Sequence, residues 1–369
     1  MAKTVRILIL GTGGMAANHA EHFAKIKGVS LVAGVDTRPE QLKAFCAKHK
    51  IAKGFSTLEE ALAWGQFDAV TNVTPDAAHY ATTMPVLAAG KHILCEKPLA
   101  TSEAQAQAMA DAAAKAGVVN MVNLSYRNVA ALQKAAQMVA EGAIGEVRHF
   151  EASYLQSWLT QPAWGHWDRE SQWLWRLSTQ HGSKGVLGDV GIHILDFATF
   201  VAGQKVEDIS ARLATFPKAP GDKIGEYPLD ANDSMALHLR LANGALGTVG
   251  ATRFASGHLN DLRLRIYGTK GGLEVAWERN ISSLRACLGD LESANWTTID
   301  CPLLGTIYER FIAAIRGEGV ADPDFARGAA LQKMLDRAEQ SAAQGGAQDS
   351  HRSRRDRRVG EWGCDLQRQ

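Results

Sequence analysis

Apolar runs of strand length alternate with helix-like stretches through the first third of the chain. Residues 5–10, Val-Arg-Ile-Leu-Ile-Leu, form one such run, and residues 15–27 after it are rich in Ala, His, Glu and Lys. The alternation predicts strands at 5–10, 31–35, 68–73, 92–95 and 118–122, and helices at 15–27, 39–50, 56–64, 77–89 and 102–116. Ser56 and Glu59 have the spacing of a capping box for the third of these helices. Strands that alternate with helices favour a parallel sheet covered on both faces.

The pattern changes after about residue 123. A helix is predicted at 130–141, followed by strands at 146–154, 206–215, 233–241, 245–254, 262–268 and 272–278, with closing helices at 306–316 and 325–344. The pair Asn243-Gly244 is a strong hairpin signal, and Gly268–Gly271 is a second turn. This half is predicted to be a largely antiparallel sheet. Such a sheet can leave one face for a partner, so self-association through it is expected.

These patterns predict an α/β protein with two domains and a tail. Residues 1–123 are expected to form a Rossmann dinucleotide-binding domain, and residues 124–344 an α/β domain with a large, mostly antiparallel sheet. Residues 345–369 include five arginines between Arg352 and Arg358 and are expected to be a disordered basic tail.

Composition limits the class of partner. Lys and Arg total 40 against 39 for Asp and Glu, so no overall field attracts nucleic acid or an anionic membrane, and the expected partner is a small molecule. Five cysteines without a CxxC pair argue against a disulfide framework or a zinc site, and no metal is expected. The chain begins directly with a strand and contains no apolar run of about 18 residues. We therefore expect a cytoplasmic protein.

A glycine-rich turn joins the first strand to the first helix. Its residues are Gly11, Thr12, Gly13, Gly14 and Met15, followed by the small residue Ala16. Such glycines permit a sharp turn and a close approach of backbone amides to a pyrophosphate at the start of the helix.

An acid follows the second predicted strand. Asp36 stands at the distance expected of a carboxylate that binds the ribose of NAD, which would repel the extra phosphate of NADP. Arg38, two residues later, is able to pair with that phosphate. We expect NAD as the cofactor, with NADP possible.

Five motifs together carry a resemblance to a known family. The chain resembles the Gfo/Idh/MocA family, the glucose-fructose oxidoreductase and inositol dehydrogenase group, over residues 5–335. The matching segments are Gly11–Ala16 (GTGGMA), Val73-Thr74-Pro75 with His79, residues 89–99 (AGKHILCEKPL), residues 142–147 (GAIGEV) and residues 187–193 (LGDVGIH). The resemblance implies an oxidoreductase that acts on the hydroxyl of a sugar, polyol or cyclitol.

Three residues are the candidates for catalysis. Lys97 follows a strand at its carboxyl end and precedes a proline that restricts its backbone, and the family's catalytic lysine maps onto it. Asp189 and His193 are spaced i, i+4, so on a predicted helix after Gly188 they share one face. We expect Lys97 to polarise the substrate oxygen and His193 to accept its proton. Asp189 is expected to orient the imidazole or to bind a hydroxyl.

Several further residues are assigned by position. Thr74, His79, Glu96 and Asn123 follow strand ends and are expected on the cofactor side, with a turn-stabilising role almost equally open for Thr74 and His79. Tyr126, Arg127 and Trp175 are expected on the substrate side, although Tyr126 and Arg127 could instead brace the domain junction. Tryptophans cluster between residues 158 and 175, where they could face a sugar ring or pack over the junction. His19, His22, His49 and His149 are expected to be structural.

The sequence therefore predicts an NAD(P)-dependent dehydrogenase of CH–OH donors that works as a homodimer or homotetramer. Two alternatives remain. One is a redox-neutral glycosidase or epimerase that oxidises its substrate transiently with bound NAD. The other is a nucleotide-binding regulator without catalysis, against which the presence of Lys97, Asp189 and His193 argues.

Overall fold

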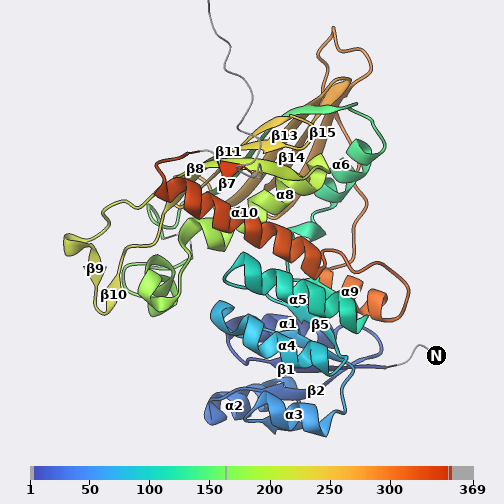
Figure 1. Ribbon diagram of the computed structural model, residues 1–369, viewed down its shortest axis with the longest axis vertical. Coiled ribbons are helices and arrows are strands. Elements are labelled where there is room, and N and C mark those ends of the chain that lie inside the picture. The colour runs from blue at the N-terminus through green and yellow to red at the C-terminus, as the bar shows by residue number, and fades with distance from the viewer. Residues whose placement is uncertain (1–3, 163, 348, 351–369) are drawn as a thin grey trace, which may run out of the picture.

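Two sheets with helices packed around them make up the fold (Figure 1). The computed structural model describes residues 4–162, 164–347 and 349–350. None of the helices in this part of the chain combines the length and the apolar character that crossing a bilayer requires.

The first sheet has six parallel strands in the order β3-β2-β1-β4-β5-β6. Its strands are β1 (Val5–Leu10), β2 (Val29–Val35), β3 (Lys53–Phe55), β4 (Ala69–Asn72), β5 (His92–Cys95) and β6 (Asn120–Val122). Its connecting helices are α1 (Gly14–Ala24), α2 (Pro39–His49), α3 (Leu58–Trp64), α4 (His79–Ala88) and α5 (Glu103–Ala116). This is the strand order of a Rossmann domain, so the predicted parallel sheet is confirmed. The short strand β3 was not predicted.

The two faces of this sheet are covered by different helices. Ile7 and Ile9 of β1 pack with residues of α1, α2 and α9 (Ile307–Ile315), whereas Leu8 and Leu10 pack with α3, α4 and α5. Alternate residues of a strand point to opposite faces, and strands covered on both faces are apolar throughout. Helix α9, far along the chain, thus completes the core of the first domain.

The second sheet has nine strands in the order β16-β15-β14-β13-β7-β12-β11-β8-β17. These strands are β7 (Val147–Gln156), β8 (Val206–Ala214), β11 (Ser234–Leu241), β12 (Leu246–Thr252), β13 (Asn260–Gly268), β14 (Gly271–Glu278), β15 (Ile281–Leu288), β16 (Thr297–Thr298) and β17 (Asp349–Ser350). Neighbouring strands are antiparallel except β7 and β12, which are parallel. The predicted, mostly antiparallel sheet is confirmed, and β15 was missed.

Helices cover one face of the second sheet and charged pairs line the other. The covering helices are α6 (Ala130–Ala140), α8 (Ile192–Ala202) and α10 (Phe325–Ala343). On the other face, Arg265 of β13 pairs with Glu151 and Glu274, and Glu274 also pairs with Arg285. A short helix α7 (Ser171–Leu174) and a small hairpin of β9 (Lys223–Ile224) and β10 (Tyr227–Pro228) extend from the edge, as Figure 1 shows for the hairpin.

Two local predictions need correction. The capping box of α3 is formed by Thr57 and Glu60, one residue after the predicted pair, since the Glu60 amide donates to the Thr57 hydroxyl at 3.2 Å and the Thr57 amide to the Glu60 carboxylate. Both pairs fit the same motif, and only the backbone distinguishes them. In the expected tail, Asp349–Ser350 instead pair with β8 as β17. The arginine run at 352–358 lies outside the described residues.

A buried ionic cluster lies where the two domains meet. Arg127, in the turn after β6, is 1% exposed and donates two hydrogen bonds to Asp196 of α8 and one to Asp322. Arg327 of α10 also binds Asp196, and the Arg127 guanidinium stacks on Phe200 at 3.4 Å. These contacts occupy Arg127 away from the pocket described below. The predicted substrate contact of Arg127 is therefore corrected to its alternative, a brace of the junction.

Arg127→Leu is expected to lower the free energy of unfolding by about 3–5 kcal/mol, because it removes the main partner of the buried Asp196 carboxylate. Urea denaturation followed by circular dichroism measures the change. Arg148→Leu, which removes an exposed pair with Glu146, is the control and should cost less than about 1 kcal/mol. A similar small loss for Arg127→Leu would contradict the role assigned to the cluster.

Candidate active site

A pocket of about 170 Å³ lies between the carboxyl ends of the Rossmann strands and the segment 175–189 of the second domain. It is lined by Met15, Val73, Thr74, Asp76, Glu96, Lys97, Trp175, Arg176, Gly182, Ser183, Lys184, Gly188 and Asp189. Six of these residues were predicted as site residues: Met15, Thr74, Glu96, Lys97, Trp175 and Asp189. The structure thus brings together residues from both halves of the chain.

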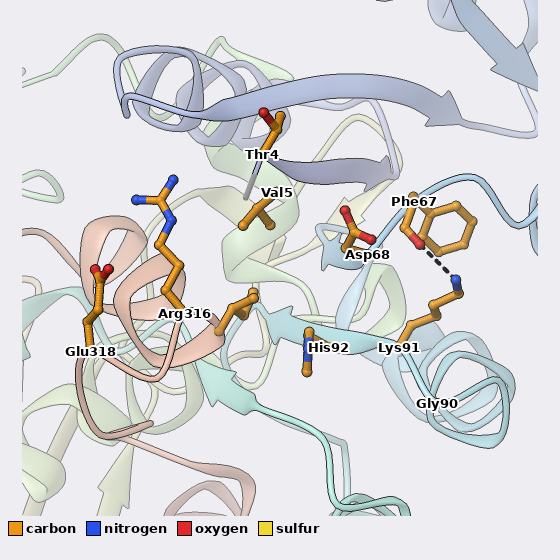
Figure 2. Close-up of a pocket in the computed structure, with 10 residues that line it drawn as sticks. Thr4, Val5, Phe67, Asp68, Gly90, Lys91, His92, Arg316 and Glu318 are labelled. Carbon is orange, nitrogen blue, oxygen red and sulfur yellow. Dashed lines mark hydrogen bonds between the residues drawn. The ribbon is translucent and has the colours of Figure 1, made fainter. Parts of the chain in front are cut away.

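A larger pocket of about 480 Å³ lies elsewhere (Figure 2). Its lining includes Val5, Asp68 and His92, which stand at the amino ends of β1, β4 and β5. In it, the Lys91 ammonium donates to the carbonyls of Gly65 and Phe67. Ligands of parallel α/β sheets bind at the carboxyl ends of the strands, so this pocket is on the wrong edge for a dinucleotide.

The glycine turn between β1 and α1 fits a pyrophosphate. Gly11 has a φ of +88°, and a Cβ atom there would lie 2.7 Å from the Val73 carbonyl oxygen. Gly13 is the N-cap of α1 without any side-chain cap, and no atom lies within 4 Å of a Cβ built on Gly13 or Gly14. The first amides of the helix are therefore open to an anion, as dinucleotide binding requires.

Asp36 is held at the end of β2 by residues of this turn. Its carboxylate accepts hydrogen bonds from the amide and hydroxyl of Thr12 at 2.9 and 2.7 Å, and from the amide and guanidinium of Arg38 at 3.0 Å. Burial raises the pKa of Asp36, but the bonds from Arg38 and Thr12 outweigh it and hold the pKa well below its usual range. The carboxylate is thus ionised and fixed beside the glycine turn.

Lys97 and Asp189 meet across the pocket. The Lys97 ammonium donates to the backbone carbonyl of Asp189 at 3.0 Å and to its carboxylate at 3.3 Å. The same carboxylate binds Arg176 at 3.0 Å and Arg253 at 3.1 Å. Burial raises the pKa of Asp189, but Arg176, Lys97 and Arg253 together bring it far below the usual value. Asp189 is therefore a half-buried carboxylate that remains charged.

His193 lies on the same helical segment but does not pair with Asp189. Residues Leu187–Gly191 form a π-helical turn that runs into α8, so the chain is already helical before Gly188. The wider turn changes the side-chain directions expected of i, i+4 residues in an α-helix, and the Asp189 carboxylate binds three cations instead. The predicted orientation of the imidazole by Asp189 is thus corrected: no hydrogen bond between them occurs in the described structure.

The His193 ring is buried and neutral. Its edge meets Tyr126 at a centroid distance of 5.1 Å, and within the described part of the chain its Nδ1 has no hydrogen-bond partner. Burial lowers the pKa of His193, and the nearby Lys97 ammonium lowers it further, to about 3. Tyr126 itself is bonded to Tyr154 and Asn260, so its contact with a substrate remains a prediction.

Glu96 is part of a buried network beneath the pocket. Its carboxylate accepts hydrogen bonds from His19 at 2.8 Å and from Asn123 at 2.6 Å. Burial raises the pKa of Glu96, but these contacts dominate and lower it to about 2. The structural role expected of His19 is confirmed. Contacts of Glu96 and Asn123 with a cofactor remain predictions, and Asn123 lies below the pocket lining.

His79 joins two loops of the site instead of facing the pocket. Its ring nitrogens lie 2.8 Å from the Pro98 carbonyl and 2.9 Å from the Thr74 carbonyl, and the side chain is fully buried. A doubly protonated ring donates to both. Burial alone would lower the pKa of His79, but Cys95, Asp76 and the Pro98 carbonyl raise it to about 10. The predicted cofactor contact is corrected to the turn-stabilising alternative, whereas Thr74 itself lines the pocket.

Three cations of the site were not predicted: Arg176, Lys184 and Arg253. Arg253 follows β12, is fully buried and stacks over Trp158 at 4.8 Å. In the sequence, the signal that could have identified Arg253 is its position as a charged residue at the end of an apolar strand. Of the tryptophans, Trp158 is buried, whereas Trp175 is 38% exposed and lines the pocket. The guanidinium carbon of Arg176 lies 4.7 Å from the centre of the Trp175 ring.

Comparison with known proteins places this geometry in a family. Residues 5–124 match the profile described as "Oxidoreductase family, NAD-binding Rossmann fold", and residues 132–274 match the "GFO/IDH/MocA C-terminal domain". A solved structure of levoglucosan dehydrogenase in complex with NADH and levoglucosan superimposes with a TM-score of 0.81 and 27% identity, over 94% of this chain and 99% of that one.

Curated relatives align over a shorter range. Levoglucosan dehydrogenase of Pseudarthrobacter phenanthrenivorans is 34% identical over 220 residues, 56% of this chain. D-glucoside 3-dehydrogenase of Escherichia coli is 32% identical over 200 residues, 54% of this chain. In each case the match spans 54% of the relative's length. With both family profiles matched in order and the whole fold shared, the chain belongs to the Gfo/Idh/MocA family of NAD-binding oxidoreductases.

Proposed function

We propose that this protein is an NAD-dependent dehydrogenase that oxidises a secondary hydroxyl of a sugar, polyol or cyclitol. The observation that carries the proposal is the contact of Lys97 with Asp189 across a pocket that begins at the glycine turn. The relatives named above, dehydrogenases of levoglucosan and of D-glucosides, support a carbohydrate substrate. The resemblance to inositol dehydrogenases extends the class to cyclitols.

NAD, when bound, supplies the hydride acceptor of the reaction. The amides of the glycine turn would hold its pyrophosphate, and Asp36 the ribose hydroxyls. The pocket between the turn and Lys97 then receives the hydroxyl to be oxidised.

Lys97 is suited to bind the reacting oxygen. An ammonium has three donors, and Asp189 accepts two of them through its carbonyl and carboxylate. The third donor is left for the substrate oxygen, which Lys97 thereby orients and polarises. Asp189 acts on the substrate through Lys97, by fixing the position of the ammonium.

His193 is the proposed proton acceptor. Oxidation of an alcohol to a ketone transfers a hydride from carbon and releases one proton from oxygen. A neutral imidazole accepts that proton, and the burial of His193 beside Lys97 keeps its ring neutral before the reaction. The products are the ketone, the reduced nucleotide and one proton that passes from His193 to solvent.

We further propose that the open face of the second sheet joins copies of this chain. The alternating Arg and Glu pairs on β7, β13, β14 and β15 form a flat, charged surface, which is able to pair with a second copy. Light scattering of the full chain would distinguish a monomer from a dimer or tetramer.

Lys97→Met is expected to lower kcat by about 10²–10⁴-fold, because it removes the donor to the reacting oxygen. Reduction of NAD followed at 340 nm with a panel of sugars and cyclitols measures it. Lys115→Met, on an exposed position of α5, is the matched control and should retain full activity. Unchanged turnover in Lys97→Met would refute the assignment, and product without net NADH would support a redox-neutral reaction instead.

The pH dependence of kcat/KM at saturating NAD is expected to be flat from pH 8 down to about pH 5. With its pKa lowered to about 3, His193 stays neutral, and so able to accept a proton, over that range. A histidine with the ordinary pKa of about 6.5 would make kcat/KM about 30-fold lower at pH 5 than at pH 8. An acid limb near pH 6.5 that disappears in His193→Gln would contradict the burial argument.

Asp36→Ser is expected to raise the preference for NADP over NAD by about 100-fold or more, because it removes a repelling carboxylate and frees Arg38 to pair with the 2′-phosphate. The ratio of kcat/KM values for the two cofactors measures the preference. Adding Arg38→Ala should abolish the gain. A ratio that stays constant in Asp36→Ser would show that the ribose lies elsewhere.

A further inference from the structure

Arg176 is a cation at the pocket wall that the reaction proposed above does not use. Its side chain is 31% exposed, and its Nη1 donates to the Asp189 carboxylate at 3.0 Å. The indole of Trp175 supports one face of the guanidinium at 4.7 Å. The group is therefore fixed in orientation while part of it faces the pocket.

Most of the donors of this guanidinium are unused. Among the described residues, the bond to Asp189 is the side-chain hydrogen bond that Arg176 makes, and its Nε is a buried atom without an acceptor. A guanidinium has five N–H donors, and a buried donor without an acceptor costs about 1–3 kcal/mol. The exposed N–H groups of Arg176 at the pocket are open to the acceptor oxygens of a ligand.

The backbone carbonyl of Arg176 is held by two side-chain hydrogen bonds. Its carbonyl accepts hydrogen bonds from the buried Arg253 at 3.1 Å and from the Ser183 hydroxyl at 2.5 Å. Ser183 and the next residue, Lys184, line the same pocket. Among the residues that the structure describes, the ammonium of Lys184 has one ion pair, at 3.8 Å, with Glu339. Two cations, Arg176 and Lys184, are thus built into one wall.

Several cations share the Asp189 carboxylate. Three cations, Lys97, Arg176 and Arg253, surround this one carboxylate. Glu96, which also lines the pocket, is hydrogen-bonded to His19 and Asn123, and the buried Asp233 lies near Arg253. Arg176, at the pocket wall, therefore shares its carboxylate partner with two other cations and keeps donors free for a ligand.

We infer that the substrate carries an anionic group, a carboxylate or a phosphate, which binds Arg176 with the help of Lys184. The planar fork of arginine donates two parallel hydrogen bonds to either group. This inference rests on the proposed function, since it names the class of sugar that enters the same pocket. Neutral sugars would leave Arg176 with unused donors and are expected to bind less well.

Binding is measured on the full chain loaded with NADH, by the change in nicotinamide fluorescence or by calorimetry. The probes are matched pairs of D-glucose with D-glucuronate, D-galactose with D-galacturonate, and D-glucose with D-glucose 6-phosphate. These pairs distinguish a carboxylate from a phosphate. At least one anionic probe should bind about 10-fold or more tightly than its neutral partner, and Arg176→Gln should remove that preference.

Two controls separate this result from other causes. Arg169→Gln, a change at a side chain that is 73% exposed, should leave the preference intact, and the Kd of NADH should stay within about twofold in Arg176→Gln. No preference in any pair, a preference that survives Arg176→Gln, or a parallel loss of NADH binding would overturn the inference. Hydride transfer is assayed separately, so a protein that binds anionic sugars without oxidising them would refute the proposed function alone.

Discussion

The structure of the site depends on a carboxylate, that of Asp189, which is half-buried yet charged. Removing Asp189 from water disfavours its ionised form, and three cations at 3.0–3.3 Å reverse that preference. Lys97 comes from the Rossmann domain, and Arg176 and Arg253 from the second domain. The same ionic contacts therefore hold the two domains together and position the Lys97 ammonium at the pocket. Any movement of one domain relative to the other would leave charges unpaired in a partly desolvated space.

A second ionic cluster lies where the domains meet, further along α8. Arg127 and Arg327 bind Asp196, which is seven residues after Asp189 on the same helical segment. Burial raises the pKa of Asp196, but Arg127 and Arg327 lower it to about 2. One segment, from the π-helical turn into α8, thus carries both anions and is held at both positions by arginine. We infer that its rigidity, rather than a bond from Asp189, keeps the His193 ring in place.

Local patterns allowed the sequence to predict much of the fold. The apolar runs around Gly11, Asp36 and Lys97 identified the Rossmann strands because each is bounded by a turn residue, and alternation identified most strands of the second sheet. The π-helical turn could not be predicted because it depends on packing between residues far apart in the sequence. Gly191, within the turn, packs against Met235, and a Cβ on Gly191 would lie 2.8 Å from the Met235 sulfur. Arg253 could not be assigned either, because it meets Asp189 from 64 positions away in the sequence.

The two acids of the site, Asp36 and Asp189, differ in how far away in the sequence their partners lie. This difference explains why the sequence predicts the cofactor class more readily than the substrate class. Asp36 binds neighbours in its own turn, so its role follows from a short motif that many dinucleotide-binding proteins share. Asp189 binds cations from three separate segments, and two of them, Arg176 and Arg253, lie outside the motifs. The cofactor class is therefore readable from a local pattern. The substrate class depends on Arg176 and Lys184, whose convergence on the pocket only the folded chain reveals.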